Sequence, residues 1–130
     1  MCADLESRGP SLKTLPKDLN QGIDLGKVIR ISIGRFDKER AEMIKARLEE
    51  AYDKLAPGIR AMKGNISFFA GIDLDQNAMV NVSAWDSLES AKQMESFKPM
   101  LDLAKEFALL EVHFERPILN FTKLWEIERD

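Results

Sequence analysis

The side chains that could do chemistry gather in one stretch of the chain, Ala78 to Met94, AMVNVSAWDSLESAKQM. Asn81, Ser83 and Trp85 stand two residues apart, the repeat that places side chains on one face of a β-strand. An amide and a hydroxyl can hydrogen-bond a carbonyl or enolate oxygen, and an indole can stack on a flat ring. We therefore take Asn81 and Trp85 as candidate catalytic residues and Ser83 as a candidate substrate-binding residue.

Each of these residues also has a structural interpretation. Trp85 would fit a dimer core with its N–H satisfied, and Asn81 and Ser83 would line a wet cavity or pair across strands. His113 is the one histidine of the chain and the natural general base near neutral pH, so it is a third catalytic candidate. Because no acid is evident to orient it, a surface or structural role is its alternative.

Further substrate-binding candidates come from neighbouring predicted strands. The guanidinium of Arg30 would hold a carboxylate or phenolate, or would instead form a salt bridge at the sheet edge or at an interface. The complete set of these candidates is Arg30, Ser32, Phe69 and Asn120. One histidine and one cysteine, Cys2, provide too few ligands for a metal site, and no cofactor is expected.

Hydrophobic periodicity predicts the elements that must position these residues. A repeat of two predicts strands, and steps of three and four predict helices. The predicted strands are Lys27–Phe36, Ile66–Asp73, Ala78–Trp85 and Glu115–Ile127. The first helix is expected from Lys38 to Ala56, where Pro57-Gly58 ends it. The second helical region, after a cap at Asp86 or Ser87, is expected to break in two at Pro99.

This order, strand-helix-strand-strand-helix-strand, is the split βαβ pattern of the ferredoxin-like α+β fold. A four-stranded antiparallel sheet would then carry both helices on one face. We expect the more apolar strand faces to meet the helices, namely Ile29, Ile31, Ile33, Ile66, Phe68, Val80 and Val82. The opposite face would be open, and on it we expect Arg30, Ser32, Ser67, Phe69, Asn81, Ser83, Trp85, Asn120 and Thr122.

An open face with such large aromatic residues would be poorly accommodated in water. A symmetric homodimer through the open sheet face is therefore the expected state, and a monomer that binds a flat ligand there is the alternative. The partners we expect are a second copy of the chain and a small aromatic ligand.

Composition limits the remaining classes of function. The chain has 130 residues, 45% of them hydrophobic, which suits one domain, expected at residues 27–130 after an N-terminal extension at residues 1–26. A net charge of −3 with interspersed signs offers no basic stripe for nucleic acid. No apolar run is long enough to cross a membrane, and the start MCADLESRGP lacks the features of a signal peptide, so a cytoplasmic protein is expected.

The strand order, the VSAWDSLESAKQM junction and the closing PILNFTKLW segment resemble the dimeric α+β barrel superfamily. Within it, they are similar to antibiotic-biosynthesis-monooxygenase-like domains, over Lys27 to Ile127. The proteins that it resembles include cofactor-independent monooxygenases acting on aromatic polyketides, haem-degrading enzymes and many members with no assigned reaction. Trp85 matches a tryptophan of the haem-degrading branch, but Met94 and Glu95 stand where that branch has its haem-ligating histidine, and its first-strand asparagine has no match either.

Two functions of different classes remain. One is a cofactor-independent monooxygenase that acts on a small aromatic or carbonyl compound and shields an electron-rich anion from water. The other is a non-catalytic small-molecule-binding or interaction protein, whose sheet face forms a homodimer core. The missing histidine and the shortage of ionisable groups on the inner face of the sheet favour the second class, and the resemblance favours the first.

Overall fold

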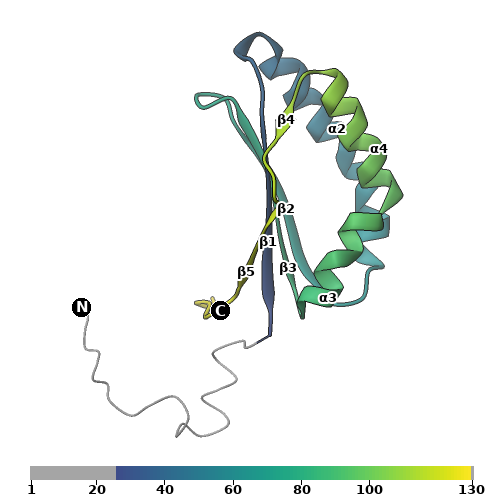
Figure 1. The fold of residues 1–130 in the computed structure, drawn as a ribbon, viewed down its shortest axis with the longest axis vertical. Helices are drawn as coiled ribbons and strands as arrows, with labels where there is room; N and C mark the ends of the chain where they lie inside the picture. The colour runs from purple at the N-terminus through teal and green to yellow at the C-terminus, as the bar shows by residue number, and fades with distance from the viewer. Residues whose placement is uncertain (1–25, 130) are drawn as a thin grey trace, which may run out of the picture. The chain divides into compact units, whose positions relative to one another are not determined.

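The computed structural model describes residues 26–129. The extension predicted for residues 1–26 lies outside the described residues except for Gly26, as does Cys2. Residues 26–122 form one compact unit, which holds all the helices and strands that the structure describes (Figure 1). Residues 123–129 belong to a second unit and have no regular secondary structure. Within that segment, Lys123 forms an ion pair with Glu126.

Strands and helices follow one another in the predicted order. The first half of the unit contains β1 (Val28–Arg35), the 3₁₀ turn η3 (Lys38–Arg40), α2 (Ala41–Arg60), β2 (Asn65–Asp73) and β3 (Ala78–Trp85). The second half contains α3 (Leu88–Ala91), the 3₁₀ turn η4 (Lys92–Ser96), α4 (Lys98–Leu109), β4 (His113–Phe114) and β5 (Leu119–Thr122).

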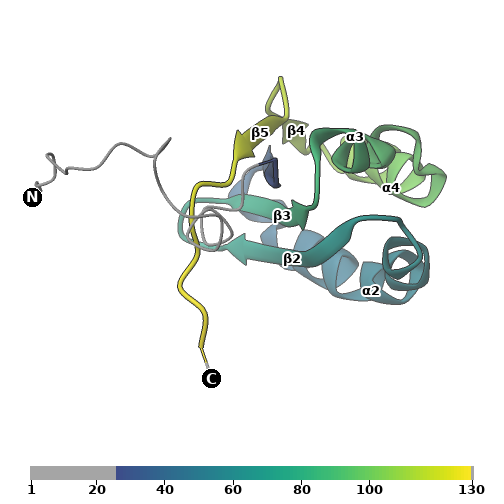
Figure 2. The same ribbon diagram turned by 90° about the horizontal axis from the view of Figure 1, so that it is seen from below.

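The strands form one antiparallel sheet in the order β2-β3-β1, with β4 and β5 both paired to the remaining edge of β1. The helices cover one face of this sheet, and the other face carries none of the described helices (Figures 1 and 2). The ferredoxin-like α+β fold is therefore confirmed. Five strands occur instead of four because the last position of the sheet is divided between two short strands, and the sheet does not close on itself.

The predicted strand Glu115–Ile127 was wrong at both ends. Pro117 has no N–H to donate to a ladder, and it lies in the gap between β4 and β5. The strand also ends five residues early, at Thr122, because Thr122 pairs with Val28, the first residue of β1. Beyond that point the edge of β1 offers no residue to pair with, although the alternation of the sequence continues.

The end predicted for the first helix was also wrong, since α2 continues through Pro57-Gly58 to Arg60. The Pro57 ring removes one N–H, but its carbonyl still accepts from the backbone N–H of Ala61 at 3.2 Å. Gly58 has a packing role: a Cβ there would lie 2.5 Å from the ring of Phe97.

The second helical region starts and breaks close to where the sequence predicts. The Ser87 hydroxyl accepts a hydrogen bond from the backbone N–H of Ser90 at 3.1 Å, the expected capping contact. The break lies at Phe97, where the backbone is extended, and Pro99 occupies the first turn of α4. A proline is tolerated there because the first N–H groups of a helix have no partner within it.

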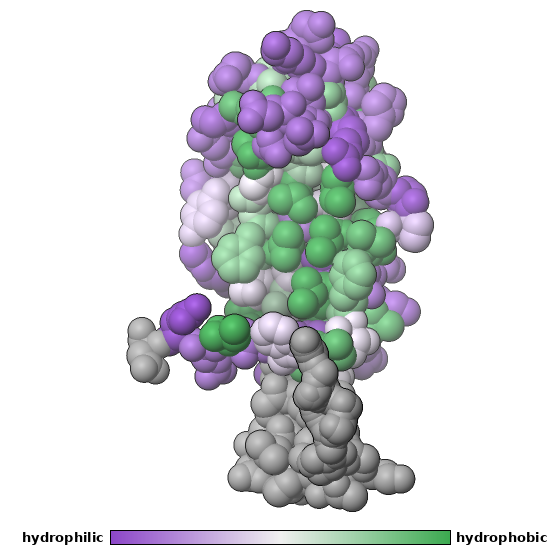
Figure 3. Space-filling view, turned by 90° about the vertical axis from the view of Figure 1, so that its left-hand side faces the viewer, coloured by the Kyte–Doolittle hydropathy of each residue, from purple (hydrophilic) through white to green (hydrophobic). Residues whose placement is uncertain are grey.

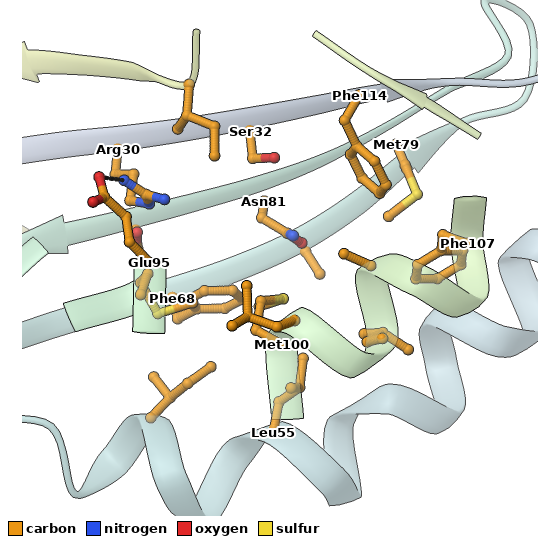
Figure 4. A pocket seen from close by; sticks show the side chains of 18 of the residues that line it. Arg30, Ser32, Leu55, Phe68, Met79, Asn81, Glu95, Met100, Phe107 and Phe114 are labelled. Atoms are coloured by element: carbon orange, nitrogen blue, oxygen red, sulfur yellow. Dashed lines mark ion pairs between the residues drawn. The ribbon is translucent and has the colours of Figure 1, made fainter. Parts of the chain in front are cut away.

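The faces of β1 and β3 are reversed relative to our expectation. The residues that face the helices are Val28, Arg30, Ser32, Gly34, Met79, Asn81, Ser83 and Trp85, and Figure 4 shows four of them, Arg30, Ser32, Met79 and Asn81, on the cavity wall. The alternating apolar set lies on the open face and comprises Ile29, Ile31, Ile33, Val80 and Val82. On β2, Phe68 faces the helices as expected, opposite Ser83. Alternation divides the residues of a strand between two faces but does not tell which face meets the helices. The more apolar face was expected there because a helix–sheet layer is usually packed with apolar side chains. Here the helices and the sheet enclose a cavity that accommodates polar groups, so the polar face meets the helices.

The core lies between the helices and the sheet. Its largest fully buried side chains are Trp85 of β3, Ile44 of α2 and Phe107 of α4. Gly34 of β1 belongs to the same layer, and a Cβ at this position would lie 2.8 Å from Val112 Cγ1 and 3.1 Å from Met79 Cγ. Three side chains therefore pack directly on the backbone of Gly34, the third being Phe114.

We expect Gly34→Ala to lower the free energy of unfolding by about 1–3 kcal/mol, because the added methyl group overpacks this layer. Gly71→Ala is the matched control, since it is also a strand glycine and its Cβ would meet Val80 at 3.7 Å, an ordinary contact. Urea unfolding followed by circular dichroism measures both. Equal stabilities of the two variants would contradict the close packing at Gly34.

Candidate functional site

A cavity of about 690 Å³ lies between the helix-facing side of the sheet and the helices α2, η4 and α4 (Figure 4). Apolar side chains of the helices form one wall, among them Leu55, Met100 and Phe107. Phe114 extends this wall from β4, and its ring meets that of Phe107 edge-on with centroids 6.5 Å apart. A largely apolar enclosure with few polar groups is the usual form of a small-molecule site.

Polar groups concentrate on the sheet wall, and the strand register brings them together. Ser32 of β1 stands opposite Asn81 of β3. Arg30 stands opposite Ser83 on one side and Asn120 of β5 on the other. All five line the cavity. Antiparallel partners on one face lie about 4.5–5.5 Å apart at Cβ, so these groups can contact a single ligand.

Arg30 is the dominant electrostatic feature of the site. It is 7% exposed, and its Nη1 has no hydrogen-bond partner among the described residues. Its ion-pair partner is Glu95 of η4, with 3.9 Å between Nη1 and Oε2, longer than a hydrogen bond. Burial lowers the pKa of Arg30 from its ordinary value, Glu95 opposes this shift, and Arg116 lowers the pKa further. The cavity thus holds a desolvated and incompletely neutralised cation.

Trp85 lies in the core and not on the cavity wall. It is fully buried, and its indole N–H donates to the Ser83 hydroxyl at 2.8 Å. Its dimer-core alternative does not describe this position, because Trp85 lies on the helix side of the sheet. Trp85 is linked to the cavity through Ser83, which lines the cavity and whose hydroxyl accepts the hydrogen bond of the indole.

Two further predicted residues lie away from the cavity. Phe69 stands opposite Val82 on the open face of the sheet and is 63% exposed. His113 stands opposite Arg35 at the end of β1, and it is exposed. Residues 29 to 35 alternate, so His113 shares the open side with Arg35. The register that gathers the polar residues in the cavity therefore leaves these two residues outside it.

Glu95 and Arg116 are charged cavity residues that the sequence did not identify. In the sequence, Glu95 is distinguished only by standing, with Met94, where the haem-degrading branch has its haem-ligating histidine. Its contact with Arg30 joins a helical turn to a distant strand, and no sequence spacing signals such a pair. Arg116 lies in the gap between β4 and β5, whose course depended on where the last strand breaks.

Within residues 26–129, no group of three or more histidine, cysteine, aspartate or glutamate side chains is arranged to hold a metal ion. No helix in that part of the chain is both long and apolar enough to span a membrane.

Comparison with known proteins gives matches among solved structures. No family model matches the chain, and no curated protein matches its sequence. A candidate antibiotic biosynthesis monooxygenase from Deinococcus radiodurans aligns over 79% of this chain and 98% of its own, with 18% identity and a TM-score of 0.60. A second, from Nitrosomonas europaea, aligns over 75% and 90%, with 12% identity and a TM-score of 0.59.

SnoaB, a cofactor-independent oxygenase from Streptomyces nogalater, also matches. It aligns over 80% of this chain and 99% of its own, with 15% identity and a TM-score of 0.57. At such identities the likeness shows the fold, and on this level the expected similarity to antibiotic-biosynthesis-monooxygenase-like structures is confirmed.

We expect Arg30→Met to raise the free energy of unfolding by about 1–4 kcal/mol, because it replaces a desolvated, incompletely paired cation by an apolar chain of similar length. Arg35→Met on the same strand is the control. Arg35 is half exposed and paired with Glu115 at 2.8 Å, so its loss should change stability by no more than about 1 kcal/mol. Urea titrations measure both, and a clear loss of stability in Arg30→Met would contradict the incomplete pairing of Arg30.

Proposed function

We propose that the chain is a cofactor-independent monooxygenase that acts on a small aromatic or carbonyl compound bound in the cavity between sheet and helices. The observation that carries this proposal is the buried Arg30 guanidinium within a largely apolar enclosure. The likeness to SnoaB, a cofactor-independent oxygenase, supports the class of reaction. The non-catalytic alternative shares the cavity and differs in predicting binding without oxygen consumption.

The reaction we propose oxidises an activated methylene group, flanked by a carbonyl or an aromatic ring, to a carbonyl. Loss of one C–H proton to solvent leaves an enolate or phenolate anion, whose carbon forms a bond to O₂. The peroxide is then protonated. Loss of the second proton from the same carbon forms the carbonyl as the O–O bond breaks, and the outer oxygen leaves as hydroxide, which takes up a proton to become water. One oxygen atom enters the product and the other leaves as water, so the four electrons taken by O₂ all come from the substrate.

Each polar residue of the sheet wall then has a role. Arg30 stabilises the substrate anion, and the apolar side chains that line the cavity strengthen such a charge interaction. Asn81 and Ser32 stand opposite one another and would hydrogen-bond the substrate oxygens. Ser83 and Asn120 flank Arg30 and would orient the ring. Because His113 lies outside the cavity, deprotonation depends on stabilisation of the anion and not on a histidine base.

We also propose that two copies of the chain associate through the open face of the sheet. Across four strands, Leu119, Ile31, Val82 and Phe69 stand opposite one another and form an apolar row. Phe69 and Leu119 are exposed in the single chain, and Figure 3 shows hydrophobic residues gathered over this face. An exposed apolar surface of this kind marks an interface, and a second sheet is the natural cover for it.

The cytoplasmic location expected from the sequence stays a prediction.

The reaction is tested with 1,8-dihydroxyanthrone, a compound with an activated methylene group, in an oxygen electrode. We expect one O₂ consumed per carbonyl formed, and a decrease in kcat/KM of at least about tenfold in Arg30→Gln and in Asn81→Ala. His113→Gln is the control and should retain the wild-type rate. Saturable binding without O₂ consumption would favour the non-catalytic alternative, and a large loss in His113→Gln would restore histidine as the base.

The association is tested by sedimentation. Phe69→Lys places a charge in the middle of the apolar row, and we expect it to convert a dimer to a monomer without loss of folding, because the side chain is exposed in the single chain. Met43→Lys is the control, since Met43 is a 54% exposed residue of α2 on the helix side. A wild-type chain that sediments as a monomer would contradict the proposed interface.

A further inference from the structure

We propose that the ligand of the cavity carries a carboxylate on a hydrophobic body, and that this carboxylate displaces Glu95 as the partner of Arg30. The inference rests on the proposal that the cavity holds the small molecule, and it does not depend on the reaction. It specifies the chemical class of the ligand, an amphipathic monoanion, and gives Glu95 a role as an internal competitor.

Arg30 lacks part of the hydrogen bonding that a buried guanidinium needs. Its side chain is 9% exposed, and Nη1, the atom nearest Glu95, is buried without a hydrogen bond. Figure 4 shows Arg30 on the cavity wall beside Glu95. A buried donor left unsatisfied costs the free energy of its desolvation, and a charged donor costs more than a neutral one. A guanidinium presents its N–H groups in a planar fork, to which the two oxygens of a carboxylate are the matching acceptor.

Glu95 has the properties of a displaceable partner. Its side chain is 59% exposed, and the 3.9 Å separation from Arg30 gives charge attraction without a hydrogen bond. It belongs to the 3₁₀ turn η4, which is held by the neighbouring buried Met94. The Glu95 carboxylate can therefore rotate into solvent while the backbone of η4 stays in place. A ligand carboxylate that hydrogen-bonds Arg30 would lie closer to it than the 3.9 Å at which Glu95 stands.

The charges at this end of the cavity match one added negative charge. Arg116 also lines the cavity, and its guanidinium lies over the Phe114 ring, 5.9 Å from the centroid. Two guanidinium groups thus stand against the single carboxylate of Glu95. When the ligand displaces Glu95, its own carboxylate replaces the lost charge and the hydrogen bonds of Arg30 are completed. Arg60, the other cavity arginine, donates to the Tyr52 hydroxyl.

The rest of the cavity suits a hydrophobic body. Leu55, Phe68, Met100 and Phe107 line it, and its volume of about 690 Å³ falls within the range of about 300–1,000 Å³ typical of drug-sized ligands. Methionine side chains adapt to different ring shapes, which favours aromatic ligands of more than one outline.

The inference is tested by calorimetry with a matched pair of ligands, 9-anthracenecarboxylate and the neutral 9-anthracenemethanol. We expect the wild-type chain to bind the carboxylate at least about tenfold more tightly than the alcohol. Arg30→Met should bind both with the affinity of the alcohol. Arg30→Lys, which keeps the charge but not the planar fork, should retain part of the preference and guards against a folding defect in Arg30→Met.

Glu95→Gln provides the more specific test. With the competing charge removed, the carboxylate should bind severalfold more tightly than to the wild type, and the alcohol should bind unchanged. Glu89→Gln, at an exposed position of α3, is the matched control and should alter neither affinity. Weaker carboxylate binding in Glu95→Gln would overturn the inference, because Glu95 would then support Arg30 and not occupy its site.

The remaining outcomes separate this inference from the proposed function. Equal affinities of the two ligands in the wild type would overturn the carboxylate class and leave a cavity that binds small molecules. Binding of neither ligand to the wild-type chain, with 1,8-dihydroxyanthrone also inactive, would overturn both.

Discussion

A cation buried without a full set of partners is the constraint on which the site depends. Arg30 projects from β1 into an apolar enclosure, and its one ion-pair partner among the described residues, Glu95, is too distant for a hydrogen bond. A buried charge without a full set of hydrogen-bond partners lowers the free energy of unfolding unless a ligand supplies them. Destabilising arrangements of this kind are concentrated at functional sites. The polar neighbours of Arg30 belong to the same feature, because strand register places Ser83 and Asn120 beside it.

The two faces of the sheet differ in the residues that they carry and in what they contact. The helix-facing side carries the polar residues and encloses the cavity, whereas the open side carries the apolar row from Leu119 to Phe69. If two copies pair through the open side, the sheet is covered on both faces. Its more apolar side would then be buried against the partner chain, although it points away from the helices. The hydrogen bond from Trp85 to Ser83 ties the core to the cavity wall.

Structural likeness at 12–18% identity relates the chain to a fold shared by antibiotic-biosynthesis-monooxygenase-like proteins and by SnoaB. A fold alone carries many reactions, so the proposed oxygenation depends on the site: an anion-stabilising arginine, opposed amide and hydroxyl groups, and an apolar enclosure. The displacement of Glu95 by a ligand carboxylate depends on fewer assumptions, since it concerns binding alone.

The sequence by itself determined the order of the elements, the α+β class and the grouping of Asn81 and Ser83 on one strand face, because periodicity and capping are local properties. Only the tertiary structure decided which face meets the helices, since alternation is symmetric between the two sides of a strand. It also brought Glu95 to Arg30, separated His113 and Phe69 from the cavity, and ended the last strand at Thr122. These outcomes depend on strand register and on contacts between residues far apart in the chain, which no local pattern encodes.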